Sequence, residues 1–161
     1  MAEDSKSSTL DDIDRRILRI LQTNGRISNA DLARRAHLSA PAMHARIKRL
    51  EQQGYIRDYV ALLNREAVGF DMLCFIHVSL QVHQPEAVER FRDAIRQLPE
   101  VLECHHITGE YDYLLKVAIR NRKDLERFVM KQLTPIRGLA HIRTSVVLSE
   151  IKSTTVLPLE P

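Results

Sequence analysis

Long apolar runs are absent from this sequence, since no stretch approaches the roughly 18 uninterrupted apolar residues that a membrane-spanning helix needs. Residues 1–8 are mostly polar and include two acids, a composition that does not suit a secretory signal. We therefore expect a cytoplasmic protein that has no membrane partner.

Cysteine, glycine and proline are also scarce, at two, five and six of 161 residues, whereas 44% of the residues are hydrophobic. This composition is typical of a folded chain, and the length allows one ordinary domain or two small ones. Cys74 and Cys104 lie in apolar, strand-like runs. We expect both to be buried free thiols in a reducing compartment, and a disulfide between them is the less favoured alternative.

The net charge of +3 is distributed unevenly. Residues 1–60 carry 11 Lys and Arg against 8 Asp and Glu, whereas residues 61–161 carry 13 of each. Between residues 26 and 57 the imbalance is sharper, with seven cations against two anions. A basic segment joined to a neutral remainder indicates that the first part binds a polyanion and the second part has another role.

Three short helices are predicted in the first 60 residues from hydrophobic positions three and four apart. The first ends at residues 24–25, the second covers 29–36 after a Ser28 cap, and the third covers about 40–53. His37 stands in the three-residue turn between the last two helices, where a left-handed backbone is expected. Two helices joined by so short a turn predict a DNA-reading helix-turn-helix.

The third helix presents small and basic residues opposite its apolar stripe. Small side chains let a helix enter the major groove, where His44 and Lys48 would reach base edges and the arginines would contact phosphates. A solvated basic surface is the alternative interpretation. The candidate DNA-binding residues are Ser39, Ala40, Pro41, Ala42, His44, Ala45, Arg46, Lys48 and Arg49. Apolar and polar residues then alternate over residues 55–62, a pattern typical of a short strand or wing.

From residue 72 onward, strand and helix patterns alternate in the order β-α-β-β-α-β. Strands are predicted at 72–82, 101–108, 112–119 and 142–148, with helices after residue 85 and before residue 134. This order is typical of a ferredoxin-like domain with both helices on one face of an antiparallel sheet. We expect the open face to be apolar and to pair with a second subunit.

The predicted fold class is therefore α+β, a winged helix-turn-helix followed by a ferredoxin-like βαββαβ regulatory domain. The expected boundaries are 1–8 for a flexible tail, 9–62 for the DNA-binding domain and 63–71 for a linker. Residues 72–161 are expected to form a domain for ligand sensing and oligomerisation.

Four stretches resemble the Lrp/AsnC family of feast/famine transcription regulators: LDDIDRRILRILQTNGRISNADLARRAHLS, RIKRLEQQGYIRDYVALLN, VLECHHITGEYDYLLKV and SVVLSEIKSTTVLPL. The resemblance covers residues 9–158. It implies homodimers that pair through their sheets and assemble further, often into octamers. It also implies a free amino acid bound between dimers that switches a metabolic gene. The segment SAPAMHARIK departs from the commoner Ser-Pro-(Ser/Thr)-Pro opening, so the family's operator preference does not transfer.

The same resemblance places an effector site at the turn of residues 108–113. Its residues are Thr108, Gly109, Glu110, Tyr111, Asp112 and Tyr113. Asp112 would accept the ammonium group, and backbone N–H groups near Gly109 would hold the carboxylate. The alternative is that Gly109 only permits a hairpin turn and Asp112 only stabilises it.

Enzymatic and metal-binding alternatives are less favoured. His105 and His106 are adjacent on a strand and face opposite sides, so together with His77 they make a poor metal site. Siroheme decarboxylases share the family architecture but have no use for a basic recognition helix, and a ligand sensor without DNA binding is disfavoured by the same helix. A global DNA-wrapping regulator without an effector stays open. We predict a non-enzymatic regulator of amino-acid metabolism genes that binds double-stranded DNA and needs no metal or cofactor besides its amino-acid effector.

Overall fold

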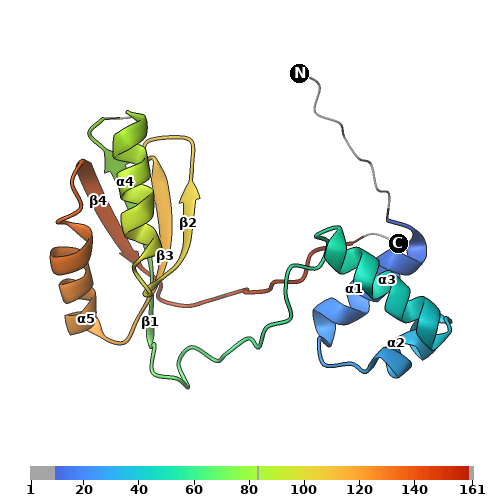
Figure 1. The fold of residues 1–161 in the computed structure, drawn as a ribbon. Coiled ribbons are helices and arrows are strands. Elements are labelled where there is room, and N and C mark those ends of the chain that lie inside the picture. The colour runs from blue at the N-terminus through green and yellow to red at the C-terminus, as the bar shows by residue number, and fades with distance from the viewer. Residues whose placement is uncertain (1–9, 83, 160–161) are drawn as a thin grey trace. The chain divides into compact units, whose positions relative to one another are not determined.

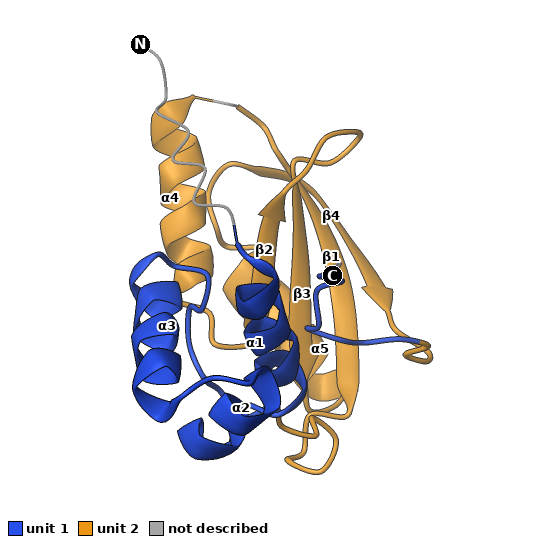
Figure 2. Ribbon diagram, turned by 90° about the vertical axis from the view of Figure 1, so that its right-hand side faces the viewer, with its two compact units in different colours: residues 1–62, 152–161 blue, residues 63–151 orange. Residues whose placement is uncertain are grey.

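The computed structural model describes residues 10–82 and 84–159, which form two compact units (Figure 2). Residues 10–62 and 152–159 belong to the first unit, and residues 63–151 belong to the second. Figure 1 shows three helices in the first unit and a four-stranded sheet with its helices in the second.

The first unit contains α1 (Asp12–Thr23), α2 (Asn29–Ala36) and α3 (Ala40–Gln52). The Ser28 hydroxyl accepts a hydrogen bond from the Asp31 N–H at 3.1 Å and caps α2. His37 has φ of 56° and ψ of 44°, and is the one non-glycine with positive φ in the described part of the chain. The predicted tight turn is confirmed, and its left-handed residue costs roughly 1–2 kcal/mol.

The core of this unit joins all three helices, with Ile17, Leu32, Met43 and Leu50 fully buried. The strand expected after α3 is absent, because no element is assigned between Gln53 and Asp71. The N–H groups of Tyr55 and Ile56 instead donate to the Leu50 carbonyl, at 2.9 and 3.3 Å. These donors close the end of α3, so they do not pair with a neighbouring strand.

The C-terminal segment of residues 152–159 packs on the first unit, although we expected it within the second domain. The Gln22 side chain of α1 explains this placement. Its amide NH₂ donates to the Leu157 carbonyl at 3.2 Å, and its oxygen accepts from the Leu157 N–H at 2.6 Å. Leu159 adds an apolar contact to the helical core.

Replacing Gln22 with alanine should release this segment, because both polar groups of the Leu157 backbone lose their partner. Two exposed hydrogen bonds contribute about 1–2 kcal/mol in total. We expect faster carboxypeptidase digestion and a lower melting temperature. Arg19→Ala is the matched control, since Arg19 is an exposed residue of the same helix, α1. Equal digestion of the two variants would mean that Gln22 does not hold the segment.

The second unit contains an antiparallel sheet of β1 (Met72–Leu80), β2 (Val101–His106), β3 (Tyr113–Ile119) and β4 (Leu139–Val146). The strand order is β2-β3-β1-β4, as the predicted ferredoxin-like topology requires. Helix α4 (Pro85–Arg96) and α5 (Arg122–Arg127), which continues into a π-helical turn η1 (Phe128–Leu133), cover one face. Phe91 and Phe128 pack from these helices on Ile76 and Leu115 of the sheet.

The open face of the sheet is more polar than expected. Its positions alternate with the buried ones, and in one row His105, Leu114, His77 and Arg143 lie side by side on the four strands. In the next row Lys116 Nζ pairs with Glu103 Oε1 at 2.9 Å. The expectation of an apolar open face was therefore wrong, because period-two alternation identifies the buried face but not the character of the other.

Two smaller differences concern the strands. Cys74 is buried as expected, but Cys104 is exposed although its run is apolar, and both thiols are free. Strand β4 begins at Leu139, three residues earlier than predicted, because Leu139 pairs with Leu80 beyond a register shift that leaves Ala140 of β4 as the extra residue. Among the described residues no helix has both the length and the apolar character needed to cross a membrane.

Candidate DNA-reading helix and effector turn

Most of the candidate DNA-binding residues lie on the exposed side of α3. The side chains of Ser39, Ala40, Pro41, His44, Ala45, Lys48 and Arg49 are exposed, whereas Ala42 and Arg46 are half-buried. Met43, Ile47 and Leu50 face the core. The Ser39 hydroxyl accepts a hydrogen bond from the Ala42 N–H at 3.4 Å, so this residue also caps the helix. The predicted division of α3 into a buried face and a free face is thus confirmed.

A buried acid of α1, Asp14, fixes two arginines of α3. Asp14 is 1% exposed, and its Oδ1 lies 2.8 Å from Arg46 Nη1 while its Oδ2 binds Arg49 Nη2. Arg46 Nη1 also lies 2.6 Å from Asp11 Oδ2. Sequence analysis missed this cluster and assigned Arg46 and Arg49 to phosphates alone. Both guanidinium groups are instead anchored at the packing surface between the two helices.

Asp11 and Asp14 also form a capping box at the start of α1. The Asp14 N–H donates to Asp11 Oδ1 at 2.7 Å, and the Asp11 N–H donates to Asp14 Oδ2 at 3.3 Å. Partial burial alone would raise the pKa of Asp11, but the hydrogen bond from the Asp14 N–H and the contact with Arg46 lower it. Acids three residues apart at a helix start are the sequence signal that would have indicated this cluster.

Several cations around α3 stay available to a polyanion. Within residues 10–82, Arg35, Lys48 and Arg57 are exposed and form no ion pair with a described residue. Lys48 lies on the free face of α3, one turn after His44. This arrangement combines two anchored arginines with a mobile ammonium group, which suits binding to a phosphate backbone.

The turn between β2 and β3 contains the candidate effector residues. Gly109 has φ of 117°, a conformation in which a side chain would be strained. The Asp112 carboxylate Oδ2 accepts a hydrogen bond from the Leu80 N–H at 2.7 Å, and the Asp112 N–H donates to the Val78 carbonyl at 3.0 Å. Asp112 therefore ties the turn to the end of β1, as the structural alternative expected.

The other turn residues point in different directions. Thr108 and Glu110 are not buried, and Tyr111 places its ring 5.1 Å from that of His77. Tyr113 is 3% exposed, and its ring centroid lies 4.6 Å from that of Phe91 in the core. The turn thus brings Thr108–Tyr111 and Asp112 to one end of the sheet, whereas the Tyr113 ring lies under it. No three His, Cys, Asp or Glu side chains of the described segments gather as metal ligands.

Comparison with known proteins identifies both domains. Residues 10–57 match the family model for a winged helix-turn-helix DNA-binding domain, and residues 73–157 match that for the Lrp/AsnC ligand binding domain. The leucine-responsive regulatory protein of Haemophilus influenzae is 39% identical over 98% of this chain and 95% of its own length. That of Escherichia coli K12 is 38% identical over 92% of this chain and 90% of its own.

Solved structures give the same result. A transcriptional regulator of Neisseria meningitidis in complex with L-methionine has a TM-score of 0.90 and 42% identity, covering 94% of this chain and 97% of the other. A feast or famine regulatory protein of M. tuberculosis complexed with L-methionine has a TM-score of 0.81 and 32% identity, covering 92% and 99%.

Two of these relatives are named as leucine-responsive regulatory proteins and one as a transcriptional regulator, which supports a regulator over the decarboxylase alternative. The match to a DNA-binding helix-turn-helix precedes the match to a ligand-binding domain, and together the two matches cover most of the chain. The chain belongs to the Lrp/AsnC family and is an Lrp-type DNA-binding transcriptional regulator.

Proposed function

We propose that this regulator contacts double-stranded DNA through the free face of α3 and controls genes of amino-acid metabolism in response to a free amino acid. The carrying observation is the arrangement on α3, where exposed His44 and Lys48 lie beside arginines that Asp14 holds in place. A recognition helix needs such a fixed orientation, because base contacts depend on the position of the helix in the groove.

The contacts of α3 would divide into two kinds. His44 and Lys48 would reach base edges or phosphates, while Ser39, Ala40, Pro41, Ala42 and Ala45 keep the helix surface low enough to enter the major groove. A guanidinium group has five N–H donors, so Arg46 and Arg49 retain donors for phosphates after binding Asp14. Their side chains are 26% and 46% exposed, which leaves room for that contact.

The effector would be an amino acid bound at the turn of residues 108–113, at an interface between subunits of a homo-oligomer such as an octamer. Two related structures contain L-methionine, which supports this chemical class. Asp112 offers its carboxylate to an ammonium group, and the backbone around Gly109 offers N–H groups to a carboxylate. The proposal includes no metal or further cofactor and a cytoplasmic location.

Lys48→Ala tests the DNA-binding face. We expect about tenfold weaker binding and a decrease of about one in the slope of log affinity against log salt, because one phosphate contact is lost. Fluorescence anisotropy at several salt concentrations, on a duplex selected by the protein from a random pool, measures both quantities. Lys123→Ala is the matched control, since Lys123 is exposed on α5 in the other unit. Indistinguishable affinities and salt slopes for the two variants would show that this face of α3 does not meet DNA.

A further inference from the structure

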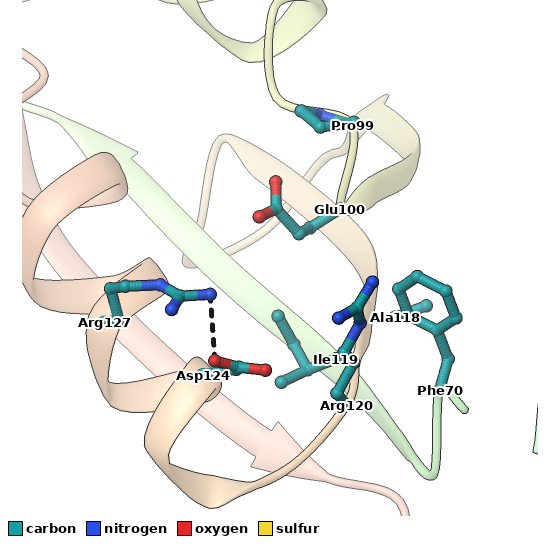
Figure 3. A pocket seen from close by; sticks show the side chains of 8 residues that line it. All are labelled: Phe70, Pro99, Glu100, Ala118, Ile119, Arg120, Asp124 and Arg127. Carbon is teal, nitrogen blue, oxygen red and sulfur yellow. Dashed lines mark ion pairs between the residues drawn. The ribbon is translucent and has the colours of Figure 1, made fainter.

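The second unit contains a cavity of about 310 Å³ at the opposite end of β3 from the effector turn (Figure 3). The turn precedes Tyr113, whereas the cavity is bordered by Ala118, Ile119 and the residue that follows the strand. Seven residues of extended strand span about 20 Å. The cavity is therefore a separate place in the fold. Its remaining walls are Phe70, Pro99, Glu100, Arg120, Asp124 and Arg127.

Glu100 and Arg120 border this cavity with opposite charges, and neither forms an ion pair with another described residue. The Glu100 Oε2 atom is buried and has no hydrogen-bond partner among the described residues. The Arg120 guanidinium carbon lies 5.6 Å from the centre of the Phe70 ring, and no described carboxylate pairs with it. A buried carboxylate oxygen without a donor is costly, so a bound donor would stabilise it.

The backbone holds Glu100 and Arg120 at the adjoining ends of two neighbouring strands, β2 and β3. The Ala118 N–H donates to the Glu100 carbonyl at 2.9 Å, immediately before β2 begins, and Arg120 immediately follows β3. In Figure 3 the Glu100 carboxylate points toward the space that the guanidinium groups of Arg120 and Arg127 also border. These two charges, which pair with no described residue, thus face one space from the same end of the sheet.

The other two charges of the cavity neutralise each other. Asp124 Oδ1 lies 2.8 Å from Arg127 Nη2, and Asp124 is further held by Asn121 at the start of α5. Phe70, Pro99 and Ile119 supply apolar wall between the charged groups. The available chemistry is therefore one anion, one cation and an apolar surface.

We propose that this cavity is a second amino-acid site, with the ligand's ammonium group on Glu100 and its carboxylate on Arg120. An apolar side chain of the ligand would lie against Phe70 and Ile119. A dianion fits less well, because the unpaired Glu100 carboxylate would repel it. A simple amine fits less well too, because it would leave Arg120 unpaired. This site is additional to the effector turn and does not depend on it.

Isothermal titration calorimetry of the full chain with L-methionine tests the site, followed by the other 19 amino acids. L-methioninol lacks the carboxylate and 3-(methylthio)propionate lacks the ammonium group, so both should bind the cavity poorly. Glu100→Gln and Arg120→Gln should each weaken one binding site per chain by roughly tenfold to hundredfold, the range expected for one charge-assisted hydrogen bond. Glu126→Gln and Arg122→Gln are matched controls on exposed positions of α5 outside the cavity.

Three other outcomes would overturn the inference. A zwitterion site would be excluded if Glu100→Gln and Arg120→Gln bound L-methionine like the controls. It would also be excluded if either analogue bound the cavity as tightly as L-methionine. Absence of binding by all 20 amino acids would exclude it as well. Asp112→Asn separates the two proposals. If Asp112→Asn removes all amino-acid binding and the cavity variants remove none, the proposed site at the turn is supported and the proposed cavity site is excluded. If the reverse holds, the cavity is the amino-acid site and the turn is not.

Discussion

Replacing Asp14 with asparagine should lower the free energy of unfolding of the first unit by about 3 kcal/mol, the lower end of the range for breaking a buried ion pair. Asp14 is 1% exposed and binds both Arg46 and Arg49, so its neutralisation leaves Arg49 without its anion and leaves Arg46 with Asp11 alone. Water reaches these arginines, whose side chains are 26% and 46% exposed, and this limits the loss. Asparagine has the same shape as aspartate, so no cavity contributes to the effect.

Asp12→Asn is the matched control for this change. Asp12 lies in the same first turn of α1, but its side chain is 91% exposed and its one ion pair, with Arg15, is 3.3 Å long. Surface pairs of this kind contribute below about 1 kcal/mol. Urea unfolding followed by circular dichroism compares the two variants. Similar midpoints would mean that the Asp14 cluster adds nothing beyond an exposed pair.

The same variant links stability to DNA binding. Arg46 and Arg49 connect α3 to Asp14 of α1, in addition to the apolar core that the two helices share, and α3 carries the candidate base contacts. Because Asp14 binds both arginines, they have a structural role on α3 in addition to any contact with phosphates. In this structure they help to hold α3, the helix on which His44 and Lys48 lie.

Elements whose formation depends on local sequence were predicted well. Helix α2 has the predicted bounds, because Ser28 caps its start and His37 takes the left-handed conformation at its end. The inward side of β1 was also predicted, since Cys74, Ile76 and Val78 alternate along the strand and all reach the core. In each case the information lies within about ten residues, where periodicity and capping operate.

Features that depend on distant residues were not predicted. Asp14 and Arg46 are 32 positions apart, and Gln22 and Leu157 are 135 apart, so no periodic pattern connects them. The cavity in the second unit draws its walls from residues 70, 99–100, 118–120, 124 and 127. No local sequence pattern marks any of these residues as part of a cavity. Only the pairing of β2 with β3 brings Glu100 close to Ala118.

Asp112 shows that the position of a residue in a turn does not determine its role. Sequence resemblance placed it in the effector turn, and the structure places its carboxylate on the Leu80 N–H at 2.7 Å. One oxygen of a carboxylate accepts more than one hydrogen bond, so anchoring the turn and binding an ammonium group are compatible. A test must therefore separate the shape of this side chain from its charge.

Asp112→Asn should abolish the proposed response of DNA affinity to an amino-acid effector, tested with L-methionine, while leaving the fold intact. The asparagine oxygen still accepts from the Leu80 N–H, but the negative charge that would bind the ammonium group is gone. Allosteric coupling of this kind changes affinity by roughly 5- to 150-fold, and we expect a ratio near one in the variant. Anisotropy titrations of the selected duplex with and without L-methionine measure it, with Asp93→Asn, an exposed acid on α4, as control.

Asp112→Ala completes the test, because it removes both the charge and the acceptor. The Leu80 N–H then loses its partner, which costs about 1–3 kcal/mol. If Asp112 binds the effector, the alanine and asparagine variants lose the L-methionine response equally, and only the alanine variant loses stability. If Asp112 serves only the turn, the asparagine variant responds like the natural protein and the alanine variant alone fails. The charge of Asp112, and not its presence in the turn, decides whether residues 108–113 form an effector site.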